Sequence, residues 1–212
     1  MTQFRYILFL PVLLTAIFIC AFIAEKRIEK DEGISVQDFQ ETLNYKEKLL
    51  DVTLKNIELQ AGDLKPEELF LRGTEAEELL RSNHISLFIY RDSVLEYWQD
   101  NDVPVPNILD ASMLQKKSCF LKKAWYVQHH HTFGEYTMLG LIFIKSEYPF
   151  ENDFLENHFA EDFGLPANVQ ISSFPVENGL PVYNIHDEYL FMLVNPDLQI
   201  TSHTAKAISI TG

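Results

Sequence analysis

The clearest indication of the fold comes from Ala124 to Lys145, which reads AWYVQHHHTFGEYTMLGLIFIK. Its two halves, Ala124 to His131 and Tyr136 to Lys145, are rich in aromatic and β-branched residues, and a turn sequence at Thr132 to Gly134 separates them. Two such runs joined by a glycine-containing turn predict an antiparallel hairpin. Since the second run is almost wholly apolar, we expect these strands to be the central and most buried ones.

Shorter runs of β-forming residues on both sides extend this sheet. Ile85 to Tyr90 and Val94 to Trp98 are joined by a turn and predict a second hairpin. A helix is predicted at Glu151 to Phe163, because Phe154, Leu155 and Phe159 keep one side apolar and Gly164 follows. Cys119 to Leu121 is predicted to form, with a break, one strand with Ala124 to His131, and the later predicted strands are Val169 to Phe174 and Tyr189 to Val194.

A long helix is predicted ahead of the strands. Ser35 to Ala61 contains neither Gly nor Pro and has apolar residues at helical spacing, and a second helix is predicted between Pro66 and Asn83. One reading of the first helix is a dimeric coiled-coil stalk, and the alternative is a helix that packs on its own domain. The residues that fall seven apart, as in a coiled-coil seam, are Val36, Leu43, Leu50 and Ile57.

The first apolar segment, Phe4 to Ala24, has the length that an α-helix needs to cross a bilayer, and it carries no charge after Arg5. A cleaved signal peptide is the alternative, but Phe22 stands where such a cleavage site needs a small residue. We therefore predict an uncleaved anchor. Basic residues flank both ends, and acidic residues dilute the second basic cluster, so we expect the body on the periplasmic side of the inner membrane.

Composition narrows the classes of partner. The chain has 31 acidic residues against 17 Lys and Arg, a net charge of −14, so nucleic acid is not an expected partner. Its two cysteines, Cys20 and Cys119, lie in the apolar segment and in the body, so no disulfide is expected within the chain.

These elements predict an α+β fold: a transmembrane helix and a long helical stalk, then an antiparallel sheet with flanking helices. The corresponding division is a cytoplasmic tail at 1–3, the anchor at 4–24, a helical stalk and linker at 25–82, a periplasmic sensor domain at 83–195 and a polar tail at 196–212.

Motifs for chemistry are few. The sequence has no nucleophile elbow, phosphate-binding glycine loop, HExxH zinc motif or kinase catalytic loop, so we expect neither an enzyme nor a bound cofactor. His129 and His131 would share one face of a strand and are weak candidates for metal ligands. The alternative is that these histidines are simply solvated near the turn.

Aromatic residues near strand ends are the more suggestive set, since such rings can line a small-ligand pocket while their polar tips orient the ligand. The alternative is that they belong to the core. The candidate ligand-binding residues are Trp98, Asn101, Trp125, Tyr126 and Tyr148.

Four parts of the body carry a resemblance to known proteins: ISLFIYRDSVLEYWQDNDVPVPN (Ile85 to Asn107), AWYV (Ala124 to Val127), the Gly134 and Tyr136 pair, and GLIFIKSEYPFENDFL (Gly140 to Leu155). Through them the chain, over roughly Glu25 to Asn195, resembles the N-terminal sensory region of certain Gram-negative bacterial sensor histidine kinases. The last of these segments is the most distinctive.

This resemblance implies an extracytoplasmic input domain like PAS or Cache modules, anchored in the membrane and dimeric through the stalk. Such a domain would receive an unknown small-molecule or protein signal. The kinase parts that follow in the family have no counterpart here, because neither a phospho-accepting histidine motif nor a nucleotide-binding motif is present. The competing expectation is a stand-alone, membrane-tethered periplasmic ligand-binding or scaffold protein without signalling output.

Overall fold

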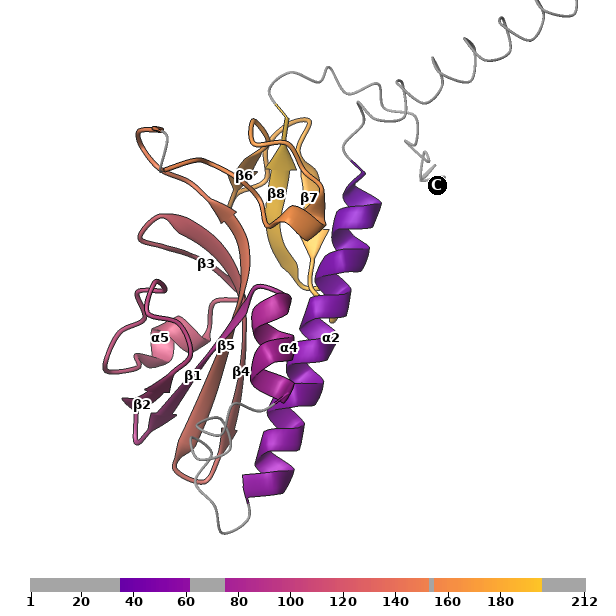
Figure 1. Ribbon diagram of the computed structural model, residues 1–212. Coiled ribbons are helices and arrows are strands. Elements are labelled where there is room, and N and C mark those ends of the chain that lie inside the picture. Colours follow the sequence, from indigo (N-terminus) through magenta and orange to yellow (C-terminus); the bar gives the residue numbers. More distant parts are fainter. Residues whose placement is uncertain (1–34, 62–74, 153–154, 196–212) are drawn as a thin grey trace, which may run out of the picture. The chain divides into compact units, whose positions relative to one another are not determined.

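The computed structural model describes residues 35–61, 75–152 and 155–195. It shows a mixed α and β fold in which the helix α2 (Val36–Ala61) lies along a five-stranded and a three-stranded antiparallel sheet (Figure 1). Helix α2 belongs to the same compact unit as both sheets.

The larger sheet has the strand order β2-β1-β5-β4-β3, with every neighbouring pair antiparallel. The predicted central hairpin is confirmed, since β4 and β5 pair along their lengths and β5 is buried over most of its residues. The hairpin before it is confirmed too. The strands are β1 (Ile85–Arg91), β2 (Val94–Trp98), β3 (Ser118–Leu121), β4 (Ala124–Phe133) and β5 (Tyr136–Ser146).

The two faces of this sheet meet different neighbours, because side chains alternate along a strand. On β5, Gly140 lies against Leu50 of α2, so a Cβ on the glycine would stand 2.5 Å from the nearest carbon of that leucine. On the other face, Leu139 and Leu141 join a core that the loop after β2 and the short helix α5 (Ala111–Leu114) cover.

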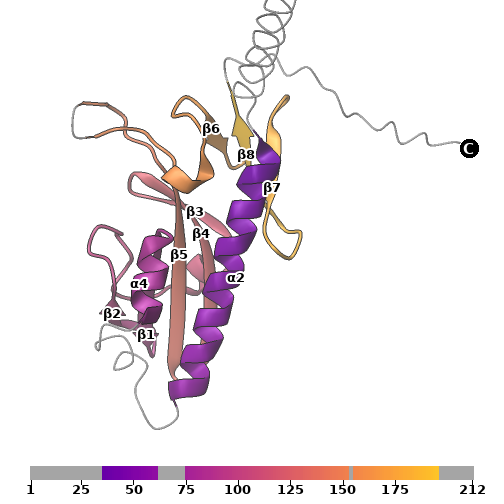
Figure 2. The ribbon, with the colours of Figure 1, turned by 45° about the vertical axis from the view of Figure 1, so that its right-hand side comes forward.

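The predicted fold class is wrong in its stalk. Helix α2 is long, at 26 residues, but it packs along its own domain, as Figures 1 and 2 show, and contacts β4, β5, β7 and the 3-10 helix η1 (Glu161–Phe163). The apolar stripe of a helix is satisfied as well by a sheet as by a second helix, and here the sheets cover it. The buried residues of this stripe are Phe39, Leu43, Leu50, Leu54 and Ile57, which include three of the predicted seam. Helix α4 (Glu75–Ser82) packs beside α2 and β1.

The smaller sheet has the order β6-β8-β7, formed by β6 (Gln170–Ser172), β7 (Leu180–Tyr183) and β8 (Tyr189–Val194). An aromatic cluster joins it to α2. The ring of Phe39 stacks on Phe163 at 4.4 Å between centroids and meets Phe191 of β8 edge-on at 6.2 Å. Such ring pairs stabilise the fold beyond the contribution that comes from burying the rings themselves.

The helix predicted at Glu151 to Phe163 is wrong except for η1 at its end, and residues 153 and 154 lie outside the described part of the chain. Side chains here bond to the backbone in place of a helical ladder. Asn152 accepts from the backbone N–H of Leu155 at 3.0 Å, and Asn157 accepts from that of Tyr148 at 2.6 Å. Side chains of this type compete with helix formation in this way.

The predicted membrane anchor, Phe4 to Ala24, lies outside the described residues. Within the described ranges no helix combines the length and the apolar character that a membrane span requires. The predicted single-pass location in the inner membrane is thereby corrected, since the structure gives it no support.

Candidate functional site

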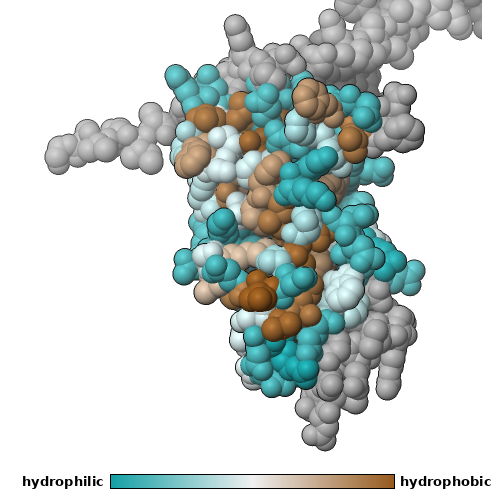
Figure 3. Space-filling view, turned by 90° about the vertical axis from the view of Figure 1, so that its left-hand side faces the viewer, coloured by the Kyte–Doolittle hydropathy of each residue, from teal (hydrophilic) through white to brown (hydrophobic). Residues whose placement is uncertain are grey.

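A cleft of about 1080 Å³ opens on the face of the larger sheet that carries Tyr126 and Phe143. Its walls come from four places: the loop 99–104 after β2, the β3–β4 turn, the α4–β1 turn and the end of β5. Figure 3 looks onto the side of the molecule where β2, β3 and α5 lie, and there hydrophobic and hydrophilic residues alternate on the surface. The site therefore offers both kinds of contact to a ligand.

Aromatic rings form the floor of the cleft. Phe143 of β5 lies at the centre, with Tyr126 of β4 edge-on at 5.9 Å and the imidazole rings of His158 and His84 at 6.1 and 6.5 Å. The neighbouring rings are inclined by 55 to 62° to the Phe143 ring and together give the cleft an apolar lining with polar edges, which suits a small organic molecule.

Two buried tyrosines on this face differ in what their hydroxyl groups do. The hydroxyl of Tyr90 donates to the carbonyl oxygen of Pro106 at 2.9 Å. Tyr126 is 6% exposed and lines the cleft, yet its hydroxyl has no hydrogen-bond partner among the described residues. Burial, followed by the nearby Asp100 carboxylate, raises the pKa of Tyr126 to about 12, so the phenol stays protonated.

The acidic wall is the loop after β2, and it is fixed to the sheet. The side-chain oxygen of Gln99 accepts from the backbone N–H of Leu87 at 3.0 Å, and the backbone N–H of Gln99 donates to the Leu87 carbonyl at 3.0 Å. Asp100 accepts from the Ser86 hydroxyl at 3.2 Å and from the backbone N–H of Asp102 at 2.8 Å. The Asp102 carboxylate has no hydrogen-bond partner in the part of the chain that the structure describes.

The basic wall is the β3–β4 turn, Lys122 and Lys123, both exposed. Lys122 has a left-handed backbone, φ 56°, and the ammonium group of Lys123 lies 5.2 Å from the ring centroid of Tyr148. The backbone N–H of Glu147 donates to the Lys123 carbonyl at 2.7 Å, which ties the turn to the end of β5.

The structure brings three of the five predicted ligand-binding residues to this cleft: Tyr126, Tyr148 and Asn101. Trp98 lies beside it, lining a smaller hollow of about 270 Å³, and its indole N–H donates to Asn101 at 2.6 Å. Trp125 does not line the cleft, because its indole donates to Glu147 at 2.7 Å and its ring packs on Phe120.

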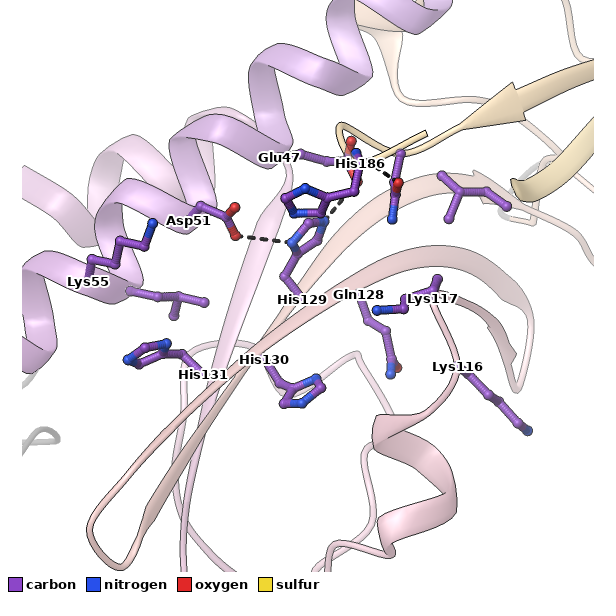
Figure 4. Close-up of a pocket in the computed structure, with 13 residues that line it drawn as sticks. Glu47, Asp51, Lys55, Lys116, Lys117, Gln128, His129, His130, His131 and His186 are labelled. Atoms are coloured by element: carbon purple, nitrogen blue, oxygen red, sulfur yellow. Dashed lines mark hydrogen bonds and ion pairs between the residues drawn. The ribbon is translucent and has the colours of Figure 1, made fainter. Parts of the chain in front are cut away.

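The two predicted metal candidates do share a face, but the side chains they meet are carboxylates of α2. His129 lies between Glu47 at 2.7 Å and Asp51 at 3.0 Å, one on each ring nitrogen (Figure 4), and His131 meets Glu58 at 2.6 Å. No group of three or more His, Cys, Asp or Glu side chains is placed to hold a metal within the described ranges.

The charge on His129 follows from these contacts. Burial of the ring lowers the pKa of His129, but the hydrogen bonds and charges of Asp51 and Glu47 outweigh that effect and raise the pKa to about 9. The hydrogen bond from His129 lowers the pKa of Asp51 in turn. A protonated ring donates from both nitrogens and has no lone pair left for a metal.

Glu47 makes this cluster a junction of three elements. It is fully buried, and its second carboxylate oxygen accepts from the backbone N–H of Ile185, in the turn between β7 and β8, at 2.9 Å. We call Glu47, Asp51 and His129 the clamp, since they hold α2 to β4 and, through Glu47, to the smaller sheet. A hollow of about 260 Å³ lies beside the clamp.

Comparison with family models, with curated proteins and with solved structures finds no match for this chain. The expected likeness to PAS or Cache modules and to sensor kinases therefore gains nothing from these comparisons, and function has to be argued from the geometry.

Proposed function

We propose that the domain is the ligand-sensing input module of a signalling receptor of the sensor histidine kinase kind, and that the cleft is its ligand site. One observation carries the proposal. The three longer segments that resemble such receptors all contribute to this cleft: Ile85 to Asn107 supplies the acidic wall, Ala124 to Val127 supplies Tyr126, and Gly140 to Leu155 supplies Phe143 and Tyr148.

The composition of the cleft supports a small-molecule ligand. Its volume of about 1080 Å³ lies slightly above the range for pockets that bind drug-sized ligands, which is about 300 to 1,000 Å³. It combines an aromatic floor with a few polar groups on fixed elements, the arrangement that orients a ligand in pockets of this kind. Tyr126 lines the cleft with a hydroxyl that has no hydrogen-bond partner among the described residues, so this group is available to a ligand.

Strand β4 offers a short route from the cleft to α2. Tyr126 faces the cleft, and His129, three residues along the same strand, is held by the clamp on the opposite face. A small shift of β4 on ligand binding would move the group to which α2 is tied, as occurs when packed elements slide past one another. Displacement of α2 is the output that this proposal requires.

A ligand-binding protein without output is the second candidate, and the tightness of the clamp favours it. Amide hydrogen exchange separates the two. An input module should change the protection of α2 when ligand is present, whereas a binding protein without output should change only the walls of the cleft.

The proposal is tested by equilibrium dialysis of the full chain against a bacterial metabolite extract, with mass spectrometry of the retained compounds. We expect at least one small molecule to be enriched, and expect Asp102→Trp, which puts bulk at the edge of the cleft, to abolish that enrichment. Glu177→Trp is the matched control, because Glu177 is also exposed but does not line the cleft. Retention of no compound, or equal retention by Asp102→Trp, would overturn the proposal.

A further inference from the structure

We infer that the ligand of the cleft is a zwitterion, with an ammonium group held at Asp100, Asp102 and Tyr126 and a carboxylate held at Lys122 and Lys123. This inference rests on the proposed function and specifies the class of ligand. Short peptides and ω-amino acids share this chemistry, because both carry the two charges at separated positions.

The acidic wall is complementary to an ammonium group. Asp100 and Asp102 lie two residues apart on a loop that is hydrogen-bonded to β1, so the sheet fixes the position of both carboxylates. The carboxylate of Asp102 has no partner among the described residues, and each oxygen of Asp100 accepts a single hydrogen bond. An ionised carboxylate can accept more than one hydrogen bond at each oxygen. Asp100 and Asp102 can therefore accept further hydrogen bonds from the three N–H donors of an ammonium group.

Tyr126 gives the independent evidence that something binds here. Tyr126 as a residue is 6% exposed, and the hydroxyl of a tyrosine buried to this extent normally has a hydrogen-bond partner, as the Tyr90 hydroxyl on the same face does. The phenol oxygen of Tyr126 stands in the field of Asp100 and Asp102. A positively charged donor therefore suits it better than an anion would.

The basic wall is complementary to a carboxylate. Lys122 has no side-chain partner within the described residues, and Arg81 adds a third cation to the lining. Lys123 rests over Tyr148, an interaction worth only about 0.5 to 1 kcal/mol at an exposed site, so its ammonium can turn to a ligand. A ligand with an ammonium group alone would leave Lys122 and Lys123 without a ligand partner.

The separation of the two walls sets the form of the zwitterion. The acidic and basic groups stand on different loops of the same cleft, one after β2 and one between β3 and β4, and the aromatic rings line that cleft as well. In an α-amino acid only one carbon atom separates the two charged groups, whereas ω-amino acids and short peptides hold them further apart. A chain of several atoms between the charges can lie across the rings.

The test is equilibrium dialysis of the full chain against a mixed tripeptide library, prepared with free termini, N-acetylated or C-amidated, and in a separate arm against 6-aminohexanoate. We expect retention of free tripeptides or of 6-aminohexanoate, and the arm that is retained distinguishes the two sources. Blocking either terminus should lower retention by about tenfold or more, the scale for loss of one partner from a desolvated charge pair.

Charge-removing variants assign each terminus to a wall. Asp102→Asn should bind free and N-acetylated tripeptides equally, and Lys122→Gln should do the same for free and amidated ones, while Glu177→Gln keeps both differences. Equal retention of blocked and free compounds by the unaltered protein would overturn the inference. So would retention of neither zwitterion. If the metabolite extract still yields a ligand that Asp102→Trp loses, the proposed function stands; if nothing binds in either experiment, both fail.

Discussion

The two faces of the five-stranded sheet differ in how completely their polar groups find partners within the described residues. On the α2 face, the buried charges have partners: Glu47 meets His129 and a backbone N–H, and Lys46 meets Asp162 at 2.5 Å and the Asn83 carbonyl at 2.7 Å. On the cleft face, the Tyr90 hydroxyl has a partner, but the hydroxyl of Tyr126, a residue that lines the cleft, has none among the described residues.

The side chains of one face fix the position of α2, whereas those of the other face remain available to bind a ligand. Buried charges with complete sets of partners fix the position of a helix, and removing one partner leaves the other buried and unpaired. Open polar groups beside a cleft contribute little to folding, but they are available to a ligand. Substitutions on the two faces should therefore separate stability from binding.

The largest effect is expected from breaking the clamp with Glu47→Ala. It removes one carboxylate from the buried His129 and leaves the Ile185 N–H without its acceptor. Removing one member of a buried pair lowers the free energy of unfolding by about 3 to 5 kcal/mol, which urea titration measures. Glu58→Ala is the control, because the Glu58 side chain is 41% exposed and its pair with His131 should contribute under about 1 kcal/mol. Similar losses in both variants would contradict the clamp.

The pH dependence of stability should come next. The folded-state pKa of His129, about 9, lies above its ordinary value of 6.5, so the stabilisation is complete below 6.5, declines as the pH rises and is gone above about 9. The difference between these two pKa values corresponds to about 3 kcal/mol of stabilisation of the folded protein. The charged and titratable groups around this ring are Glu47, Asp51 and Lys55 on α2, His130 and His131 on β4, and His186 in the turn between β7 and β8.

Urea titrations of the unaltered protein and of His129→Gln, at about pH 6 and about pH 9.5, measure this effect. The unaltered protein should lose stability across this interval, and His129→Gln should lose much less. Parallel behaviour of the two proteins would assign the pH dependence to other groups.

A smaller effect is expected from Gly140→Ala, where α2 comes closest to the sheet. The added methyl group would meet Leu50, and overpacking of this kind lowers the free energy of unfolding by about 1 to 3 kcal/mol. In a Leu50→Ala background the same change should have little effect, because the obstructing carbons are gone. Equal effects in both backgrounds would show that the contact with Leu50 is not the cause.

The smallest effects on stability are expected from the two buried tyrosines. Tyr90→Phe loses a hydrogen bond and should lower the free energy of unfolding by about 1 kcal/mol. Tyr126→Phe loses no hydrogen bond among the described residues and should change it by less than about 0.5 kcal/mol. A larger loss in Tyr126→Phe than in Tyr90→Phe would mean that the Tyr126 hydroxyl has a structural role.

Sequence patterns predicted the strands where turn residues and apolar runs agreed. The central hairpin is an example, since the residues on both sides of Gly134 pair as expected. β7 was not predicted, because LPVY is short and contains a proline. The stalk was wrong because heptad spacing shows that Leu43, Leu50 and Ile57 face one partner, without showing whether that partner is a second helix or the chain's own sheet.

The candidate site was predictable only in part. Aromatic residues at strand ends indicated Tyr126 and Tyr148, whereas no sequence motif singles out Asp100 and Asp102, which the fold brings to the same cleft. The partners of His129 could not be predicted, because Asp51 and Glu47 lie 78 and 82 positions away in the chain.

Retention of cleft ligand by the two tyrosine variants tests the division between the faces most directly. Tyr126→Phe and Tyr90→Phe are compared, by equilibrium dialysis at equal folded concentration, for the compounds that the unaltered chain retains from the metabolite extract. Tyr126→Phe should lose most of this retention and Tyr90→Phe should keep it. Full retention by Tyr126→Phe, or an equal loss in both variants, would contradict the assignment of the cleft as the binding face.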